Sequence, residues 1–142
     1  MDITSSNAVY MLSVSTLFPS PIQLQQFGSD DIFTAPPIAS METLMGVDGF
    51  LSGGVVFVGI PNNITLQADS DSNSIFDQWW RQQILGRKAY PAAGTLLLPS
   101  TGEKWAMTNG FLTSYQPMPD AGRVLRARRF TILWNDVSPG PM

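Results

Sequence analysis

Helical periodicity is confined to one segment of this chain, and this constrains the fold more than any other feature. Residues 69–88 read DSDSNSIFDQWWRQQILGRK, with an apolar stripe at helical spacing formed by Ile75, Phe76, Trp79 and Trp80. Ser70 or Ser72 can cap the start, Asp77 lies in an early turn where the helix dipole favours it, and Gly86 is typical of a helix end. The sequence therefore predicts one helix, so strands must supply the rest of the core.

The other segments are short, rich in β-branched and aromatic residues, and separated by proline, glycine and asparagine. We expect strands over residues 8–18, 22–27, 38–46, 55–60, 64–68, 95–98, 105–115 and 123–134, with turns at 19–21, 61–63 and 117–122. The predicted fold class is mainly β, an antiparallel β-sandwich or barrel with one flanking α-helix. A chain of 142 residues suits a single domain, with loose ends at about 1–7 and 135–142.

The stretch LPSTG at residues 98–102 fits the signal that sortases cut between threonine and glycine. Such a signal needs a following apolar anchor, whereas here the charged Glu103 and Lys104 follow, and then further apparent strands. Proline, serine, threonine and glycine together supply what a tight turn needs. We therefore predict a hairpin turn.

Charged residues make up only 13% of the chain, about half the share that is usual for a soluble domain. No apolar run approaches the roughly 20 residues that span a bilayer, so we expect no membrane insertion. The composition instead favours burial of surface between copies of the chain. The charges are also divided, because residues 1–80 hold eight acidic and no basic side chains, while residues 81–142 hold all eight basic ones. If the fold does not mix the two halves, this division favours head-to-tail contacts between copies.

The chain contains neither cysteine nor histidine. Disulfides, thiolate or imidazole metal sites and Ser-His or Cys-His catalytic pairs are therefore excluded. We expect no catalytic residues, no metal and no cofactor, and hence no enzyme.

Two segments are candidates for contacts with partners. Residues 46–54, GVDGFLSGG, combine four glycines with apolar side chains. They form either a loop folded back on its own core or a loop that docks on a neighbouring subunit through Val47, Asp48, Phe50 and Leu51. Residues 123–129, RVLRARR, fit either a phosphate-binding strip or a strand with interfacial ion pairs, through Arg123, Arg126, Arg128 and Arg129.

Trp79 and Trp80 allow two interpretations. At helical spacing with Phe76 they indicate packing in the core or at an interface. If Trp80 is exposed instead, it can act as a stacking platform, and the chain is then a carbohydrate-binding β-sandwich module.

The order of segments resembles the tail tube proteins of long-tailed bacteriophages of the contractile-tail type. The resemblance is carried by FGSDDIF (27–33), the loop GVDGFLSGG (46–54), NNITLQADSDSNSIFDQWW (62–80) and VLRARRFTILW (124–134). It implies a virion structural protein whose subunits close into rings, most often hexameric, that stack into a tube for DNA delivery. It also implies ring stacking through residues 46–54 and packing of the helix on the sheet and on neighbours through Phe76, Trp79 and Trp80.

The resemblance further implies tail sheath, tape-measure and baseplate proteins as partners, and assembly in the host cytoplasm. A tube-capping or baseplate-adjacent ring protein is the alternative within this class. DNA is expected to pass without specific binding, because a duplex carries one negative charge per about 1.7 Å and a basic lumen would hold it. Asp30, Asp31 and Asp48 are the candidate acidic residues of such a channel.

Overall fold

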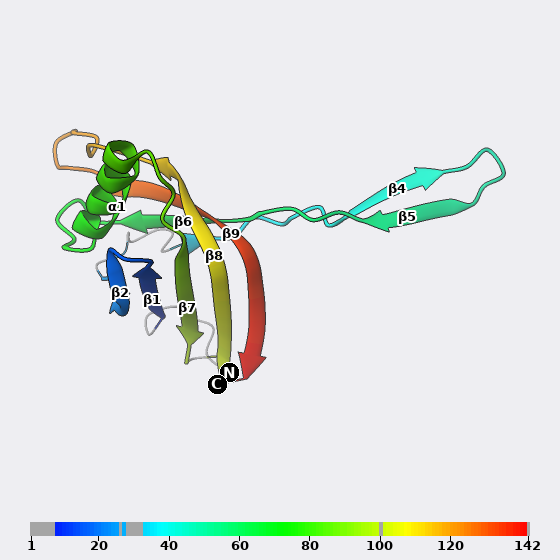
Figure 1. The fold of residues 1–142 in the computed structure, drawn as a ribbon, viewed down its shortest axis with the longest axis horizontal. Coiled ribbons are helices and arrows are strands. Elements are labelled where there is room, and N and C mark those ends of the chain that lie inside the picture. The colour runs from blue at the N-terminus through cyan, green and yellow to red at the C-terminus, as the bar shows by residue number, and fades with distance from the viewer. Residues whose placement is uncertain (1–7, 26, 28–32, 100, 142) are drawn as a thin grey trace.

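The computed structural model describes residues 8–25, 27, 33–99 and 101–141. The elements, in chain order, are β1 (Val9–Val14), β2 (Phe18–Gln23), β3 (Phe33–Thr34), β4 (Met41–Met45), β5 (Leu51–Val55), β6 (Ile60–Leu66), α1 (Asn73–Gly86), β7 (Ala92–Leu98), β8 (Glu103–Tyr115) and β9 (Arg128–Pro141). Seven strands form one antiparallel sheet in the order β2-β1-β7-β8-β9-β6-β3, and β4 pairs with β5 in a separate hairpin. Figure 1 shows α1 at one end of the body and this hairpin projecting from the other. The predicted class, mainly β with one flanking helix, is confirmed.

The first predicted turn is wrong. Residues 19–21, PSP, lie inside strand β2, and the chain turns earlier, at residues 15–17, where Thr16 has a φ of 65°. Two prolines fit in β2 because it is the edge strand of the sheet and pairs only with β1, so its outer side needs no amide donors. The expected strand over 8–18 is accordingly shorter, and the one over 22–27 ends at Gln23.

The second predicted turn, PNN at residues 61–63, is also wrong, because these residues continue strand β6. Pro61 pairs with Leu133 of β9, whereas on the other side β3 reaches only Asn63 and Ile64. Pro61 therefore lies where one side of β6 has no strand partner, a position that proline tolerates. The expected strand over 55–60 contributes only its two ends, Val55 and Ile60.

The long hairpin β8–β9 extends the sheet beyond what the sequence indicates. Leu98 accepts hydrogen bonds from the amides of Thr101 and Gly102, and Gly102 has a φ of 71°, so the predicted turn between β7 and β8 is confirmed. The expected loose end at 135–142 is wrong for residues 135–141, because β9 runs to Pro141 opposite Glu103. The expected strand over 123–134 begins only at Arg128. The expected loose end at 1–7 lies outside the described residues.

Helix α1 lies within the predicted segment. Ser72 occupies the N-cap position, but its hydroxyl accepts the amide of Gln25 (2.9 Å) instead of capping the helix. The hydroxyl of Ser70 donates to the carbonyl of Gln25 (2.5 Å). The helix ends at Gly86 as expected, although the left-handed residue that closes it is Arg87. The serines therefore join the start of the helix to the chain that leaves β2.

The core lies between α1 and one face of the sheet. Its fully buried large side chains are Trp79, Trp134, Tyr10, Phe76, Phe130, Leu12, Leu24, Ile64, Leu66, Ile132 and Val14. The hydroxyl of Tyr10 donates to Oδ1 of the buried Asn62 (2.7 Å), whose Nδ2 donates to the carbonyl of Thr34. Burial raises the pKa of Tyr10 well above its usual range, so Tyr10 remains neutral and can donate.

Gly110 provides a sharp test of packing between β8 and β9. It pairs with Trp134 in the register, and a Cβ on Gly110 would lie 2.4 Å from Cε3 of that buried indole. Gly110→Ala is expected to lower the free energy of unfolding by about 1–3 kcal/mol, because the rigid ring must shift. Urea unfolding measures this, with Gly140→Ala as the control, since a Cβ there meets nothing within 4 Å. Equal unfolding midpoints for the two variants would contradict the packing.

Candidate functional site

The candidate site begins with a segment that leaves the body between β3 and β6. We call residues 35–59 the arm. Its strands β4 and β5 pair from Met41 opposite Val55 to Met45 opposite Leu51. The turn between them is closed by hydrogen bonds from the Gly46 amide to the carbonyl of Phe50 (2.8 Å) and from the Phe50 amide to Oδ1 of Asp48 (3.2 Å). The predicted loop 46–54 is thus a hairpin turn followed by most of β5.

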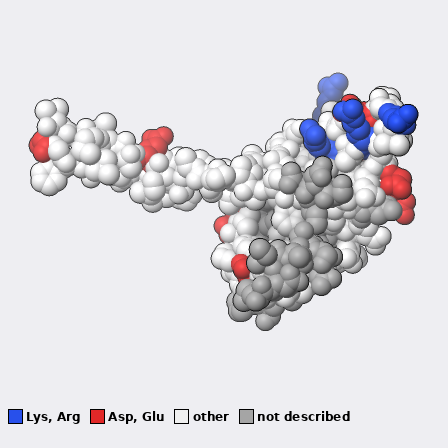
Figure 2. Space-filling model, turned by 180° about the vertical axis from the view of Figure 1, so that it is seen from behind, with Lys and Arg blue, Asp and Glu red and all other residues white. Residues whose placement is uncertain are grey.

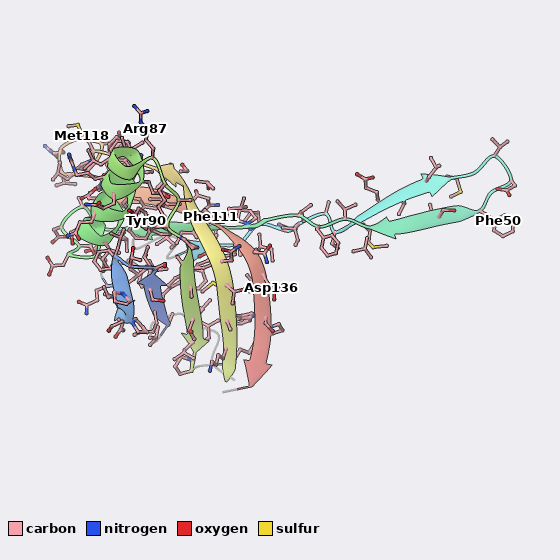
Figure 3. All side chains as sticks on the ribbon, in the orientation of Figure 1. Phe50, Arg87, Tyr90, Phe111, Met118 and Asp136 are labelled. Carbon is pink, nitrogen blue, oxygen red and sulfur yellow. The ribbon has the colours of Figure 1, made fainter. Side chains whose placement is uncertain are left out.

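The arm is apolar and exposed over most of its length. Residues 34–55 are all exposed, and Figure 3 shows Phe50 at the far end of the arm, away from the body. The exposed fractions are 109% for Val47, 74% for Phe50 and 62% for Leu51. The interpretation in which this loop folds back on its own core is therefore wrong. An exposed apolar segment of this size is typical of a surface that binds a partner.

The two faces of the arm differ. Side chains alternate along a strand, so one face carries Met41, Thr43, Met45, Leu51, Gly53 and Val55. The opposite face carries Glu42, Leu44, Ser52 and Gly54. The first face has no charge, which makes it the better candidate for burial against a partner.

The predicted arginine cluster is divided in the structure. Arg123 and Arg126 lie in the exposed segment between β8 and β9, and Arg129 is exposed at the start of β9. Arg128 is only 6% exposed and pairs with Asp77 of its own chain (2.7 Å). The prediction of an interfacial ion pair is therefore wrong for Arg128, because its charge is already compensated within the subunit.

Asp77 links α1 to the sheet. Its carboxylate accepts hydrogen bonds from Arg128 and from the hydroxyl of Tyr115, while Arg128 also donates to the carbonyl of Gln116 (2.9 Å). Burial raises the pKa of Asp77, but the hydrogen bonds from Arg128 and Tyr115 and the charges of Arg128 and Arg81 outweigh it, so the pKa lies below its ordinary value. The start of β9 is thereby held against the helix.

This ion pair predicts a pH dependence of stability. A carboxyl group whose pKa is lower in the folded state stabilises fully above its unfolded pKa, and this contribution is lost as the pH falls through the folded pKa. Asp77→Asn is expected to lower the free energy of unfolding at pH 7 by about 1–2 kcal/mol, and by less below about pH 4. Unfolding curves between pH 2 and 7, with the exposed Asp71→Asn as control, measure the effect. A constant difference between wild type and Asp77→Asn across this range would contradict it.

The predicted helix residues lie in two environments. Phe76 and Trp79 are fully buried, and the ring of Phe76 stacks on Phe130 with centroids 4.3 Å apart. Trp80 is 37% exposed and stacks on Tyr115 (5.0 Å, 12° between planes). One face of the Trp80 ring is therefore occupied, which leaves at most the other face for a sugar ring.

Of the candidate channel residues, Asp48 lies in the turn of the arm, while Asp30 and Asp31 lie outside the described residues. Within the described ranges there is no group of three His, Cys, Asp or Glu side chains that could hold a metal ion. No helix in that part of the chain is long and apolar enough to cross a membrane.

Solved structures share this fold at low sequence identity. The sheath/tube terminator of the extracellular contractile injection system PVC in its extended state has a TM-score of 0.68 and 15% identity, over 99% of this chain and 97% of that chain. The sheath-tube complex of the same system has a TM-score of 0.65 and 15% identity, over 94% and 88%. The tube terminating cap of the anti-feeding prophage has a TM-score of 0.58 and 10% identity, also over 94% and 88%.

The fold is therefore shared with sheath-tube, terminator and cap structures of contractile injection systems. A family model for tail fiber protein gp32 matches residues 1–138, so the chain belongs to the tail fiber protein gp32 family. No curated protein matches the sequence.

Proposed function

We propose that this chain is a ring-forming subunit of the tube in a contractile tail, where stacked, hexameric rings enclose the path of DNA. The exposed apolar arm carries this proposal. A monomer that leaves Val47, Phe50 and Leu51 in water gains stability when a neighbour covers them. The same fold occurs in one sheath-tube complex, which supports a place in such a tube.

A tube terminator or cap that forms a single ring is the second candidate. The likeness to a sheath/tube terminator, at a TM-score of 0.68 over 99% of this chain, supports it at least as well as the repeating subunit. A likeness to a tube terminating cap points the same way. The two candidates differ in whether both sides of the ring bind another ring of the same protein.

The proposed partners are further copies of this chain, the sheath, the tape-measure and the baseplate proteins, with assembly in the host cytoplasm and a final place in the virion. DNA passes through the channel without specific binding, and the net charge of −3 is consistent with a channel that does not bind it. Whether Asp48 contributes to that channel stays a prediction. We propose a structural role without catalysis.

Sedimentation velocity and negative-stain electron microscopy of the purified protein at rising concentration test this function. Long tubes support the repeating subunit, and single rings that bind the end of a preformed tube support the terminator. A protein that stays monomeric at high concentration, alone and with its tail partners, would contradict both.

A further inference from the structure

The large hydrophobic side chains that are exposed among the described residues fall into two groups at opposite ends of the molecule. The arm carries Ile38, Met41, Leu44, Met45, Val47, Phe50, Leu51, Val55, Phe57 and Val58. The second group comprises Trp80, Ile84, Leu85, Met118, Val124 and Leu125. Of the exposed large hydrophobic side chains in the described ranges, only Leu133 belongs to neither group. We call residues 80–88 and 117–129, which hold the second group, the basic end. Figure 3 shows Arg87 and Met118 at the end of the body opposite to the arm.

The two ends carry opposite charges. The arm holds Glu42 and Asp48 and no basic residue. The basic end holds one acidic residue, Asp120, and the basic residues Arg81, Arg87, Lys88, Arg123, Arg126, Arg128 and Arg129. Arg128 is neutralised by Asp77, and the other basic side chains are exposed. In Figure 2 the visible basic side chains gather at this end, whereas acidic side chains lie on the arm, on the body and beside the basic side chains.

The local order of residues also matches. On the arm, Asp48 lies two residues before the apolar pair Phe50 and Leu51. In the basic end, Arg123 and Arg126 flank Val124 and Leu125, which are 76% and 59% exposed. A hollow of about 640 Å³ lies beside this segment, and its lining includes Arg123, Val124, Leu125, Gln67, Ala68 and Asp69.

We propose that the basic end of a second copy is the surface on which the arm docks, an inference that rests on the proposed function and names its contact. The apolar side chains of the two ends form the centre of the contact, and Asp48 in the turn of the arm meets arginines at its rim, while Glu42 on the opposite face adds to the negative charge of the arm. The rim charges select the partner surface, because an arm brought against another arm places like charges together. Each copy gives its arm to one neighbour and its basic end to another, which is a heterologous contact that builds a ring or a tube.

A reciprocal charge exchange tests this pairing. One variant carries Glu42→Lys and Asp48→Lys, so its arm and its basic end are both positive. The other carries Arg123→Glu and Arg126→Glu, so its arm and the changed part of its basic end are both negative. All four positions are exposed. Each variant alone is expected to assemble only at a concentration at least about tenfold higher than wild type. An equimolar mixture is expected to assemble near the wild-type concentration, with the two variants alternating.

Two controls keep the outcomes distinct. Glu103→Lys with Asp136→Lys makes the same change of charge on the body and is expected to leave assembly near wild type. Asp48→Asn keeps an acceptor for the Phe50 amide, so it separates loss of charge from distortion of the turn. Variants that assemble like wild type, or a mixture that does not restore assembly, would overturn the docking and leave the proposed function standing. Failure of the wild type to assemble would instead remove the proposed function.

Discussion

Trp79→Ala is expected to lower the free energy of unfolding by about 3–5 kcal/mol, the largest loss of stability that we predict for one substitution. The Trp79 side chain is fully buried, and its ring stacks near Phe76 with centroids 6.3 Å apart. Its Nε1 donates to the carbonyl of Tyr90 (3.0 Å). The substitution removes one of the two largest fully buried side chains of the core and leaves that carbonyl without its donor.

Urea unfolding followed by circular dichroism measures the effect, and the adjacent Trp80→Ala is the matched control. Trp80 is partly exposed and stacks on one aromatic ring, Tyr115, so its loss is expected to cost about 0.5–1.5 kcal/mol. Equal destabilisation by the two substitutions would show that the core is not organised around Trp79.

Phe50→Ser combined with Leu51→Ser is expected to abolish assembly while the subunit stays folded. Both side chains are exposed, so their loss changes the free energy of unfolding of the monomer by only about 0.5 kcal/mol. In the assembly each is expected to act as an apolar anchor worth about 2 kcal/mol, so each contact loses about 4 kcal/mol, or nearly a thousandfold in affinity.

Sedimentation velocity measures assembly of this double variant, and Glu103→Ser with Lys104→Ser provides a control at the exposed start of β8. The control is expected to assemble like wild type. If the arm variant no longer folds, Phe50 and Leu51 stabilise the subunit itself. If it folds and assembles normally, the two side chains make no important contact in the interface.

Elements set by local sequence could be predicted, whereas elements set by distant partners could not. The helix within 69–88 and the turn at 98–102 depend on apolar periodicity and on turn residues, which are local signals. By contrast, residues 135–141 form a strand because β8 lies alongside them, and nothing in their own composition indicates this. The prolines within 19–21 and 61–63 indicate turns when the sequence is considered alone. They fit in strands because the sheet leaves one side of those strands unpaired at these residues, which the sequence does not reveal.

The candidate site was predictable to a similar extent. Glycines interspersed with apolar side chains in residues 46–54 indicate a loop that either folds back or docks, and exposure of the arm excludes the first. The pairing of Asp77 with Arg128 joins residues 51 positions apart, so only the fold reveals which arginine is occupied. The roles of Ser70 and Ser72 were missed for a similar reason, since a serine before a helix indicates a cap and not a bond to Gln25.

A cryo-electron microscopy reconstruction of the assembled protein tests the central claim most directly. The proposal predicts a ring or tube in which the arm lies against the basic end of a neighbouring copy, with Phe50 covered by that neighbour. An assembly in which the arm projects into solvent, with Phe50 as exposed as the 74% of the single subunit, would contradict it.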